Sequence, residues 1–389
     1  MDKNSKSTGT GKKTGGKKKI DRRKQIIMRC SITAAVVLVV IIAIVLFVKK
    51  GKKTTDDTAT TTEKVTEIKD ATTENKNEST TEEIITKDGM VMSDLTGEWI
   101  DESLANHRPV CIMINNIIDA IPQSGIGSAD VIFEFKVEGS LTRLLAVFKD
   151  YDDITKLGPV RSARHYYVEM ADMLDGIYCH FGWSPLAEQR IPELGVNNIN
   201  GLFYEGLVYY RDSSRYAPHD VYTNGEMIND GIDAENYSRD YIKNHDKVFA
   251  FNQEDKKLGS GKTANTIKTA YAHNSPWFEY DAETGLYNRF QYSVAHIDDQ
   301  TGEQLKFKNV IVMLAQYTSL DGVDHQDLNW DKGGKAFYAT DGEYIEITWK
   351  LDNGVLKFFT EDGKQLKMNP GKTFVAVFDE KNPEGVTFE

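Results

Sequence analysis

Three short segments between residues 158 and 219 concentrate side chains that could bind an anion. A GPVRSAR motif occupies residues 158–164, a CHFGWSP motif residues 179–185, and an RDSSRYAPH motif residues 211–219. Arginine side chains form bidentate hydrogen bonds with carboxylate and phosphate groups. The polar side chains of the three motifs that we expect to bind a ligand are Arg161, Ser162, Arg164, His180, Ser184, Arg211, Arg215 and His219.

Two of these segments are predicted to lead into helices. Ser162 is expected to cap a helix over residues 162–175, and Ser184 with Pro185 has the N-cap and N1 pattern of a second helix. A helix N-terminus presents free N–H groups and the positive end of the helix dipole, which favour anions. The sequence therefore predicts a cationic pocket for an anionic group, provided that the segments converge.

Carboxylates on a neighbouring strand allow two interpretations. Glu134 and Glu138 are four residues apart, so in a strand both would lie on one face and could act as an acid/base pair. Alternatively, these two residues and Asp130 could pair with nearby arginines in a buried structural network. The arginines expected in that network are Arg143, Arg161 and Arg164.

The usual signatures of catalytic and cofactor sites are missing from the sequence. It has no HExxH, CxxC, Walker-type phosphate loop or SxxK motif, and residues 182–186 lack the final glycine of a nucleophile elbow. The spacing of His180 and His219 does not indicate a metal site. Three cysteines exclude a disulfide framework, and buried free thiols are expected for Cys111 and Cys179. We therefore predict no cofactor and no metal, and leave open whether the protein is an enzyme.

Charge is distributed very unevenly along the 389 residues. Residues 1–53 contain 15 Lys and Arg against two Asp, which leaves 32 basic and 57 acidic residues, a net charge of −25, in the rest. A chain with that balance is not expected to bind nucleic acid. The uncharged residues 30–48 span about 28 Å as a helix, close to the hydrocarbon thickness of a bilayer.

This apolar segment is predicted to anchor the protein in the plasma membrane. Eleven Lys and Arg precede it and four follow it, which places residues 1–29 in the cytoplasm and the C-terminal part outside. No cleavage site follows it, so we expect an uncleaved signal anchor. Residues 49–89 are rich in Thr and charged residues and have no aromatic side chains, so we expect a disordered linker.

The folded region is expected to contain two differently patterned parts. In residues 90–250, apolar runs predict strands at 110–114, 131–137, 144–148 and 177–181, and a capping box that begins at Thr223 predicts a further helix. In residues 262–384, strands separated by Asp-Gly, Asn-Gly and Asn-Pro-Gly turns predict an antiparallel meander. The strands expected there are residues 309–317, 335–339, 343–349, 355–359 and 373–378. The predicted fold class is α+β, with a layered α/β N-terminal domain and a mostly antiparallel β C-terminal domain.

The chain resembles the YerB-like family of envelope proteins, a family of unknown function. The resemblance covers most of residues 100–380, and its most specific motif is GPVRSAR at residues 158–164. It also includes RP at 108–109, PQSG at 122–125, VEG at 137–139 and APH at 217–219. This chain differs in having Asn115 where relatives often have Asp, and Trp183 where they often have Gly. The resemblance implies a layered α/β first domain and a site of action outside the cytoplasm.

Three functional hypotheses follow from these observations, and the third is that the protein is a purely structural partner of wall-synthesis machinery whose polar residues serve folding. In the first, the protein is membrane-tethered and binds an anionic cell-envelope ligand or an envelope protein. In the second, it is a cell-wall hydrolase or transferase in which Glu134 or Glu138 acts as acid or base, His180 or His219 assists, and Arg161 and Arg164 hold an anion. The absent catalytic signatures favour the first hypothesis.

Overall fold

The computed structural model describes residues 86–244, 246–320 and 325–389. The predicted cytoplasmic tail, the predicted membrane segment and residues 49–85 lie outside these ranges. No helix in the described ranges is long and apolar enough to cross a membrane.

The last residues of the predicted linker form a hairpin with the start of the folded region. Strand β1 (Thr86–Lys87) pairs antiparallel with β2 (Met90–Met92), which in turn pairs with β3 (Trp99–Asp101). Asp88 and Gly89 between the first two strands both have positive φ, as a tight two-residue hairpin turn requires. Regular structure therefore begins a few residues earlier than predicted.

One large sheet contains strands from both halves of the chain. Its order is β12-β22-β21-β18-β25-β5-β6-β4-β7-β8, and β23 also pairs with β22. The strands of the first half are β4 (Val110–Asn115), β5 (Val131–Lys136), β6 (Thr142–Phe148), β7 (Ile177–His180) and β8 (Asn198–Asn200). Those of the second half are β12 (Lys262–Thr263), β18 (Asn309–Ala315), β21 (Gly334–Thr340), β22 (Glu343–Asp352), β23 (Val355–Phe359) and β25 (Thr373–Asp379).

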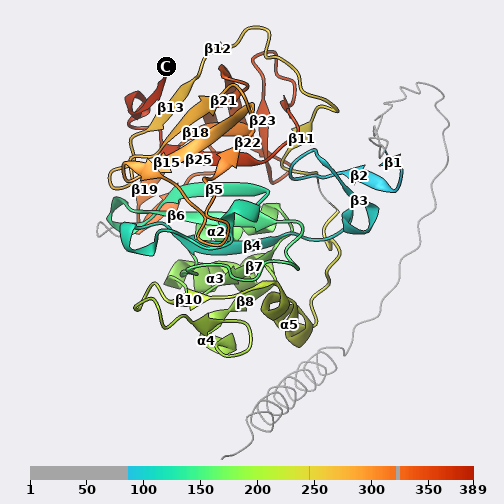
Figure 1. The fold of residues 1–389 in the computed structure, drawn as a ribbon, viewed down its shortest axis with the longest axis vertical. Coiled ribbons are helices and arrows are strands. Elements are labelled where there is room, and N and C mark those ends of the chain that lie inside the picture. The colour runs from blue at the N-terminus through green and yellow to red at the C-terminus, as the bar shows by residue number, and fades with distance from the viewer. Residues whose placement is uncertain (1–85, 245, 321–324) are drawn as a thin grey trace, which may run out of the picture. The chain divides into compact units, whose positions relative to one another are not determined.

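Strand β25 connects the two groups of strands. It pairs in parallel with β5 on one side and with β18 on the other. In Figure 1 the green strands of the first half lie in the lower part of the sheet and the orange and red strands of the second half in the upper part. Strands β18, β21, β22 and β23 form the predicted antiparallel meander. Strand β25 instead pairs in parallel with β18.

Each face of the large sheet is covered by its own hydrophobic core. On β5, Phe133 and Phe135 belong to one core and Ile132 to the other, because successive side chains of a strand point to opposite faces. Helices α2 (His165–Met173) and α3 (Pro185–Leu194) contribute to the first core, and α5 (Gly225–Glu235) contributes to the second. The short helix α4 (Gly201–Tyr204) follows β8 directly.

A second, smaller sheet packs on the same face as α5. Its order is β16-β15-β14-β13-β26, with β17 also paired to β15. Ile267, Phe278 and Tyr287 from this sheet lie in the second core. The strands are β13 (Thr266–Thr269), β14 (Trp277–Asp281), β15 (Leu286–Gln291), β16 (Val294–Ala295), β17 (Lys306–Phe307) and β26 (Val386–Phe388).

Short strand pairs and 3-10 turns complete the described structure. The pairs are β9 (Tyr210–Arg211) with β10 (Val221–Tyr222), β11 (Ala250–Phe251) with β24 (Lys367–Met368), and β19 (Tyr317–Ser319) with β20 (Gln326–Leu328). The turns are η1 (Glu102–Leu104), η2 (Ile118–Ala120), η3 (Ile126–Ser128), η4 (Glu138–Ser140) and η5 (Pro383–Gly385).

The α+β class predicted from the sequence is confirmed, and two details of helix capping were wrong. Helix α2 begins at His165 with Arg164 at the N-cap and no side-chain cap, whereas the Ser162 hydroxyl donates to the Phe181 carbonyl. Helix α5 is capped by Asn224, because the Thr223 hydroxyl donates to the Val208 carbonyl instead. Ser184 caps α3 as predicted, by accepting a hydrogen bond from the Ala187 amide.

Candidate functional site

The GPVRSAR segment runs across the carboxyl ends of the parallel strands β4 and β7. The Arg161 amide donates to the Met113 carbonyl at 2.9 Å, and the Arg161 carbonyl accepts from the Phe181 amide at 3.0 Å. The Ala163 amide donates to the Gly182 carbonyl at 2.9 Å. Backbone hydrogen bonds to both strands therefore fix the segment in an extended conformation. In α/β sheets ligands commonly bind at this end of parallel strands.

Arg143 lies at the centre of a cluster of three arginines. It is the residue opposite Asn115 in the β4–β6 pairing, and its Nη1 donates to the Ser162 carbonyl at 2.6 Å. Burial, together with the charges of Arg164 and Arg161, lowers the pKa of Arg143 to about 10. The three guanidinium groups are therefore close enough to repel one another. We call Arg143, Arg161 and Arg164 the arginine cluster.

Within the described part of the chain, one member of the arginine cluster, Arg164, has a carboxylate partner. Arg164 forms a bidentate ion pair with Glu138, with Nε–Oε1 at 2.5 Å and Nη2–Oε2 at 2.7 Å. Burial acts to raise the pKa of Glu138, but the hydrogen bonds and charge of Arg164 outweigh it and hold that pKa below its usual value. The ion pair between Arg164 and Glu138 is the part of the predicted structural network that the structure contains. Arg143 and Arg161 donate to backbone carbonyls instead.

Arg161 has free hydrogen-bonding capacity. Its Nη1 donates to the Pro218 carbonyl at 3.3 Å in an exposed contact, and its buried Nε has no hydrogen-bond partner among the residues that the structure describes. Burial and the charge of Arg164 both lower its pKa. A buried donor without a partner is costly, and an oxygen of a bound anion would satisfy it.

A second buried polar group near the cluster also lacks a partner. Tyr178 on β7 is fully buried, and its hydroxyl has no hydrogen-bond partner in the described structure. Burial raises its pKa, and Arg164 and Arg143 are near enough to act in the opposite direction. Tyr178 could not be predicted as a site residue from the sequence, because a tyrosine in an apolar run is indistinguishable from an ordinary core residue.

The RDSSRYAPH segment brings His219 and Arg215 beside Arg161. The Asn115 side-chain amide lies 2.7 Å from His219 Nδ1, a geometry in which the amide donates and the imidazole is neutral. Burial, followed by the charge of Arg161, lowers the pKa of His219, and Arg215 acts in the same direction. Arg215 itself donates to the Pro122 carbonyl at 2.8 Å. The segment therefore places a neutral imidazole next to Arg161, through Pro218 and His219.

Three other predicted ligand residues have local partners instead. His180 is fully buried with Nδ1 2.8 Å from the Gly182 carbonyl and Nε2 3.2 Å from the Asn198 side chain, and burial lowers its pKa to about 4. Ser184 is used as the cap of α3. Arg211 pairs with two carboxylates at 2.9 Å, those of Glu205 and Asp220.

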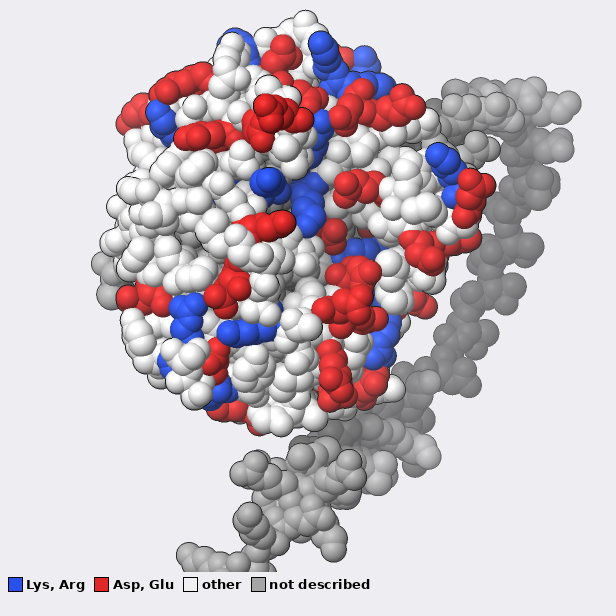
Figure 2. Space-filling model, in the orientation of Figure 1, with Lys and Arg blue, Asp and Glu red and all other residues white. Residues whose placement is uncertain are grey.

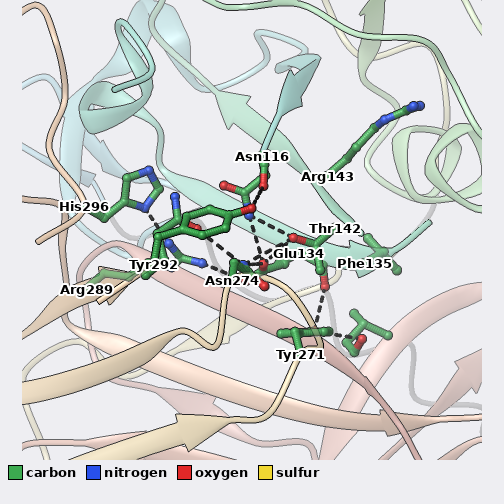
Figure 3. A network of polar contacts seen from close by, with 12 residues as sticks. Asn116, Glu134, Phe135, Thr142, Arg143, Tyr271, Asn274, Arg289, Tyr292 and His296 are labelled. Carbon is green, nitrogen blue, oxygen red and sulfur yellow. Dashed lines mark hydrogen bonds and ion pairs between the residues drawn. The ribbon is translucent and has the colours of Figure 1, made fainter. Parts of the chain in front are cut away.

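Glu134 belongs to a separate, fully buried polar network (Figure 3). Its Oε2 forms an ion pair with Arg289 Nη2 at 2.8 Å, and its Oε1 accepts from the Asn116, Thr142 and Asn274 side chains at 2.7–3.0 Å. Arg289 and Asn274 come from the second half of the chain. In Figure 3 the Arg143 side chain points away from this network.

The prediction that Glu134 and Glu138 share one face of a strand is wrong. Strand β5 ends at Lys136, and Glu138 begins the 3-10 turn η4, so the alternation that places residues i and i+4 together does not reach it. The two carboxylates have no partner in common: Glu134 pairs with Arg289 and Glu138 with Arg164.

An exposed apolar wall lies next to the arginine cluster. Trp183 is bridged to Ala163 through the backbone, and its ring lies 5.8 Å from that of Phe203 on α4. Phe203 is 70% exposed and its neighbour Leu202 is 56% exposed. Figure 2 shows acidic side chains spread over the visible face of the molecule with basic ones between them. Since the residues after position 53 carry a net charge of −25, the arginine cluster is a cationic site in an acidic part of the chain.

Two family models match the chain. The first, described as the N-terminal domain of "Protein of unknown function (DUF3048)", matches residues 95–238, and the second, its C-terminal domain, matches residues 267–375. The chain belongs to this family. The GPVRSAR segment and all three members of the arginine cluster lie within the first matched range.

A curated relative and a crystal structure extend this result. The "Putative lipoprotein YerB" of Bacillus subtilis (strain 168) is 31% identical over 287 residues, which cover 73% of this chain and 85% of that protein. The crystal structure of YerB protein from Bacillus subtilis superposes with a TM-score of 0.69 at 28% identity, covering 76% of this chain and 99% of that one. The YerB-like, DUF3048 assignment is therefore confirmed.

Proposed function

We propose that this protein binds an anionic group of a cell-envelope ligand in the arginine cluster. The proposal rests on an imbalance of charge. Three guanidinium groups interact electrostatically, and the one carboxylate paired within the cluster is that of Glu138, with Arg164. Coulomb repulsion between partly buried like charges is unfavourable. A carboxylate or phosphate would relieve it and would also provide an acceptor for Arg161 Nε.

The surroundings of the cluster limit the kind of ligand that fits. The wall of Trp183, Leu202 and Phe203 offers apolar contact to whatever carries the anionic group. His219 is held neutral by its Asn115 contact and donates from Nε2 rather than adding a full charge. These features favour a carboxylate or phosphate that is attached to a larger group, such as a wall peptide or a phosphate polymer.

The place of action that we propose is outside the cytoplasm, close to the plasma membrane. The apolar residues 30–48 and the excess of basic residues before them support a single-pass anchor with the folded part outside. The printed name of the Bacillus subtilis relative describes a putative lipoprotein, which is consistent with a membrane-associated family. An envelope protein with a suitable acidic or terminal carboxylate is an equally suitable partner.

Neither of the glutamates considered for hydrolysis has the surroundings of a general acid. Glu134, on β5 of the large sheet, is fully buried and is paired with Arg289, so a substrate cannot reach it. The pKa of Glu138 is held low by Arg164, which disfavours the protonated form that donates a proton. The geometry therefore favours binding over acid/base catalysis by these two residues.

The test measures stabilisation of the full chain, purified in mild detergent, by phosphate, citrate and soluble wall peptides. A ligand at 100 times its Kd adds about 2.7 kcal/mol to the free energy of unfolding. We expect Arg161→Ala to abolish this gain, and Arg211→Ala, which changes an arginine with its own carboxylate partners, to keep it. Equal stabilisation of the native protein and Arg161→Ala would refute the proposal.

A further inference from the structure

A hollow of about 660 Å³ lies on the outward side of the small sheet, formed by other elements than those of the arginine cluster. It is lined by the outward-facing side chains of β13, β14 and β26, by the loop that ends at Pro276, and by Glu384 and Gly385. The inward-facing residues of the same strands, Ile267 and Phe278, are in the core. The hollow is therefore built on a rigid, well-packed sheet.

An aromatic platform forms part of this hollow. Trp277 lines it, while Phe290 on the adjacent strand β15 stacks against the indole with ring centroids 4.8 Å apart and planes at 7°. Phe290 is not among the residues that line the hollow, so it supports the indole from the opposite face. The indole Nε1 donates to Glu279 at 2.8 Å, which fixes the orientation of the ring.

Hydroxyl and carboxylate groups surround the platform. In the pairing of β13 with its neighbours, Thr266 lies opposite Glu279, and Lys268 lies between Trp277 and Thr387. Thr266 and Thr387 line the hollow from the outward face of the sheet, whereas Thr269, two residues after Ile267, is buried on the inward side. Threonine hydroxyls at the wall of a hollow can exchange hydrogen bonds with the hydroxyls of a ligand.

The charge of the hollow selects among possible ligands. Glu279, Glu384 and Glu389 outnumber Lys268, which pairs with Glu389 at 2.6 Å. Carboxylates accept hydrogen bonds from hydroxyl and ammonium groups and repel anions. A ligand for this hollow should thus be neutral or cationic, unlike the ligand of the arginine cluster.

We propose that this hollow is a carbohydrate-binding subsite for a neutral sugar or an amino sugar. The apolar C–H face of one pyranose ring would lie on the indole of Trp277, as amphipathic aromatic rings permit. Sugar hydroxyls would donate to Glu279 and exchange hydrogen bonds with the hydroxyls of Thr266 and Thr387. The flat, supported indole and its polar rim have the composition of a small-ligand site, in which an apolar surface is combined with a few oriented polar groups.

The experiment titrates the full chain in detergent with four probes and follows binding by calorimetry and tryptophan fluorescence. The probes are tetra-N-acetylchitotetraose, its de-acetylated glucosamine tetramer, an anionic uronate tetramer and trilysine. We expect saturable binding of the first two and none of the uronate. Trp277→Ala should weaken sugar binding at least tenfold, and Trp277→Phe, which keeps an aromatic platform, should retain most of it.

Two further variants separate this subsite from the rest of the molecule. Glu279→Gln removes one carboxylate from the exposed rim and should weaken binding of the glucosamine tetramer severalfold without affecting folding. Arg161→Ala should leave sugar binding unchanged, so failure here and failure at the arginine cluster are distinguishable. Absence of saturable sugar binding would overturn the proposal, as would binding that Trp277→Ala does not change. The protein could instead bind trilysine but not the sugars, and lose this binding in Trp277→Ala. That result would identify a groove for basic peptides and would also overturn the carbohydrate proposal.

Discussion

Two arginine-containing regions of this protein use the same side chain in opposite ways. Arg289 is fully buried and ion-paired with Glu134, and its guanidinium lies 4.7 Å from the Phe374 ring centroid. Arg161 is only partly buried and has no carboxylate partner among the described residues, whereas the Nε atoms of both arginines lack a hydrogen-bond partner there. Arg289, with its buried acid, holds two parts of the chain together, whereas we propose that Arg161, near solvent and without an acid, binds a ligand.

The largest effect is expected when the buried pair is broken. Glu134→Ala leaves the guanidinium of Arg289 buried without a carboxylate, which costs about 3–5 kcal/mol of the free energy of unfolding. Denaturant-induced unfolding measures this loss. The matched double variant, Glu134→Gln with Arg289→Met, removes both charges and should recover much of it. A loss below about 1 kcal/mol in Glu134→Ala would contradict a structural role for the pair.

The next largest effect is the pH dependence of stability caused by His180. This residue is the last of β7 and is fully buried, like Arg289. Burial lowers its folded-state pKa to about 4, from 6.5 in the unfolded chain. The unfolded state therefore binds the proton more readily than the folded state. The contribution of neutral His180 to the free energy of unfolding is fully present above pH 6.5. About 3 kcal/mol of it is lost as the pH falls from 6.5 to 4. His180→Gln should flatten this part of the stability curve. Identical slopes for both proteins between pH 6.5 and 4 would contradict the assignment.

A much smaller effect on the free energy of unfolding is expected when Arg161 is replaced in the ligand-free protein. Arg161→Ala removes one weak hydrogen bond to Pro218 and also relieves repulsion by Arg143 and Arg164. These terms oppose each other, so the free energy of unfolding should change by less than about 1 kcal/mol. Thermal and denaturant unfolding of the ligand-free protein check this. A loss above about 2 kcal/mol would make Arg161 structural and remove the contrast with Arg289.

The smallest effect is expected at an exposed, fully paired arginine. Arg211 forms surface ion pairs with Glu205 and Asp220, and exposed pairs contribute about 0–1 kcal/mol. Arg211→Ala should therefore change neither stability nor anion binding measurably, at physiological or at high salt. If it weakened anion binding as strongly as Arg161→Ala does, the ligand site would extend beyond the arginine cluster.

Strands with continuous apolar runs could be predicted from the sequence. Residues 110–114, 131–137 and 144–148 correspond closely to β4, β5 and β6, because strands that are buried on both faces need apolar side chains throughout. In the second half, the strand predicted at residues 343–349 forms the first part of β22, where the buried Ile347 and Trp349 alternate with exposed residues. The small sheet was missed, because its short strands mix exposed and buried polar residues.

The polar contacts were predicted less completely than the strands. Local pattern favoured Ser162 as a helix cap, but tertiary pairing of its segment with β4 and β7 holds it in an extended conformation. The partner of Glu134 could not be found, since Arg289 is 155 residues away and nothing in its local sequence indicates burial. The convergence of Arg143 with Arg161 and Arg164 depends on which strands are neighbours, which the sequence pattern alone does not determine.

The position of β25 has a consequence for how the protein is made. This strand is the parallel neighbour of both β5 and β18, yet its residues 373–379 are synthesised after both of them. Until it arrives, β5 and β18 each keep one edge without hydrogen-bonded neighbours, and open edges invite pairing with other chains. A nascent or truncated chain without these seven residues should consequently be the form that needs a chaperone.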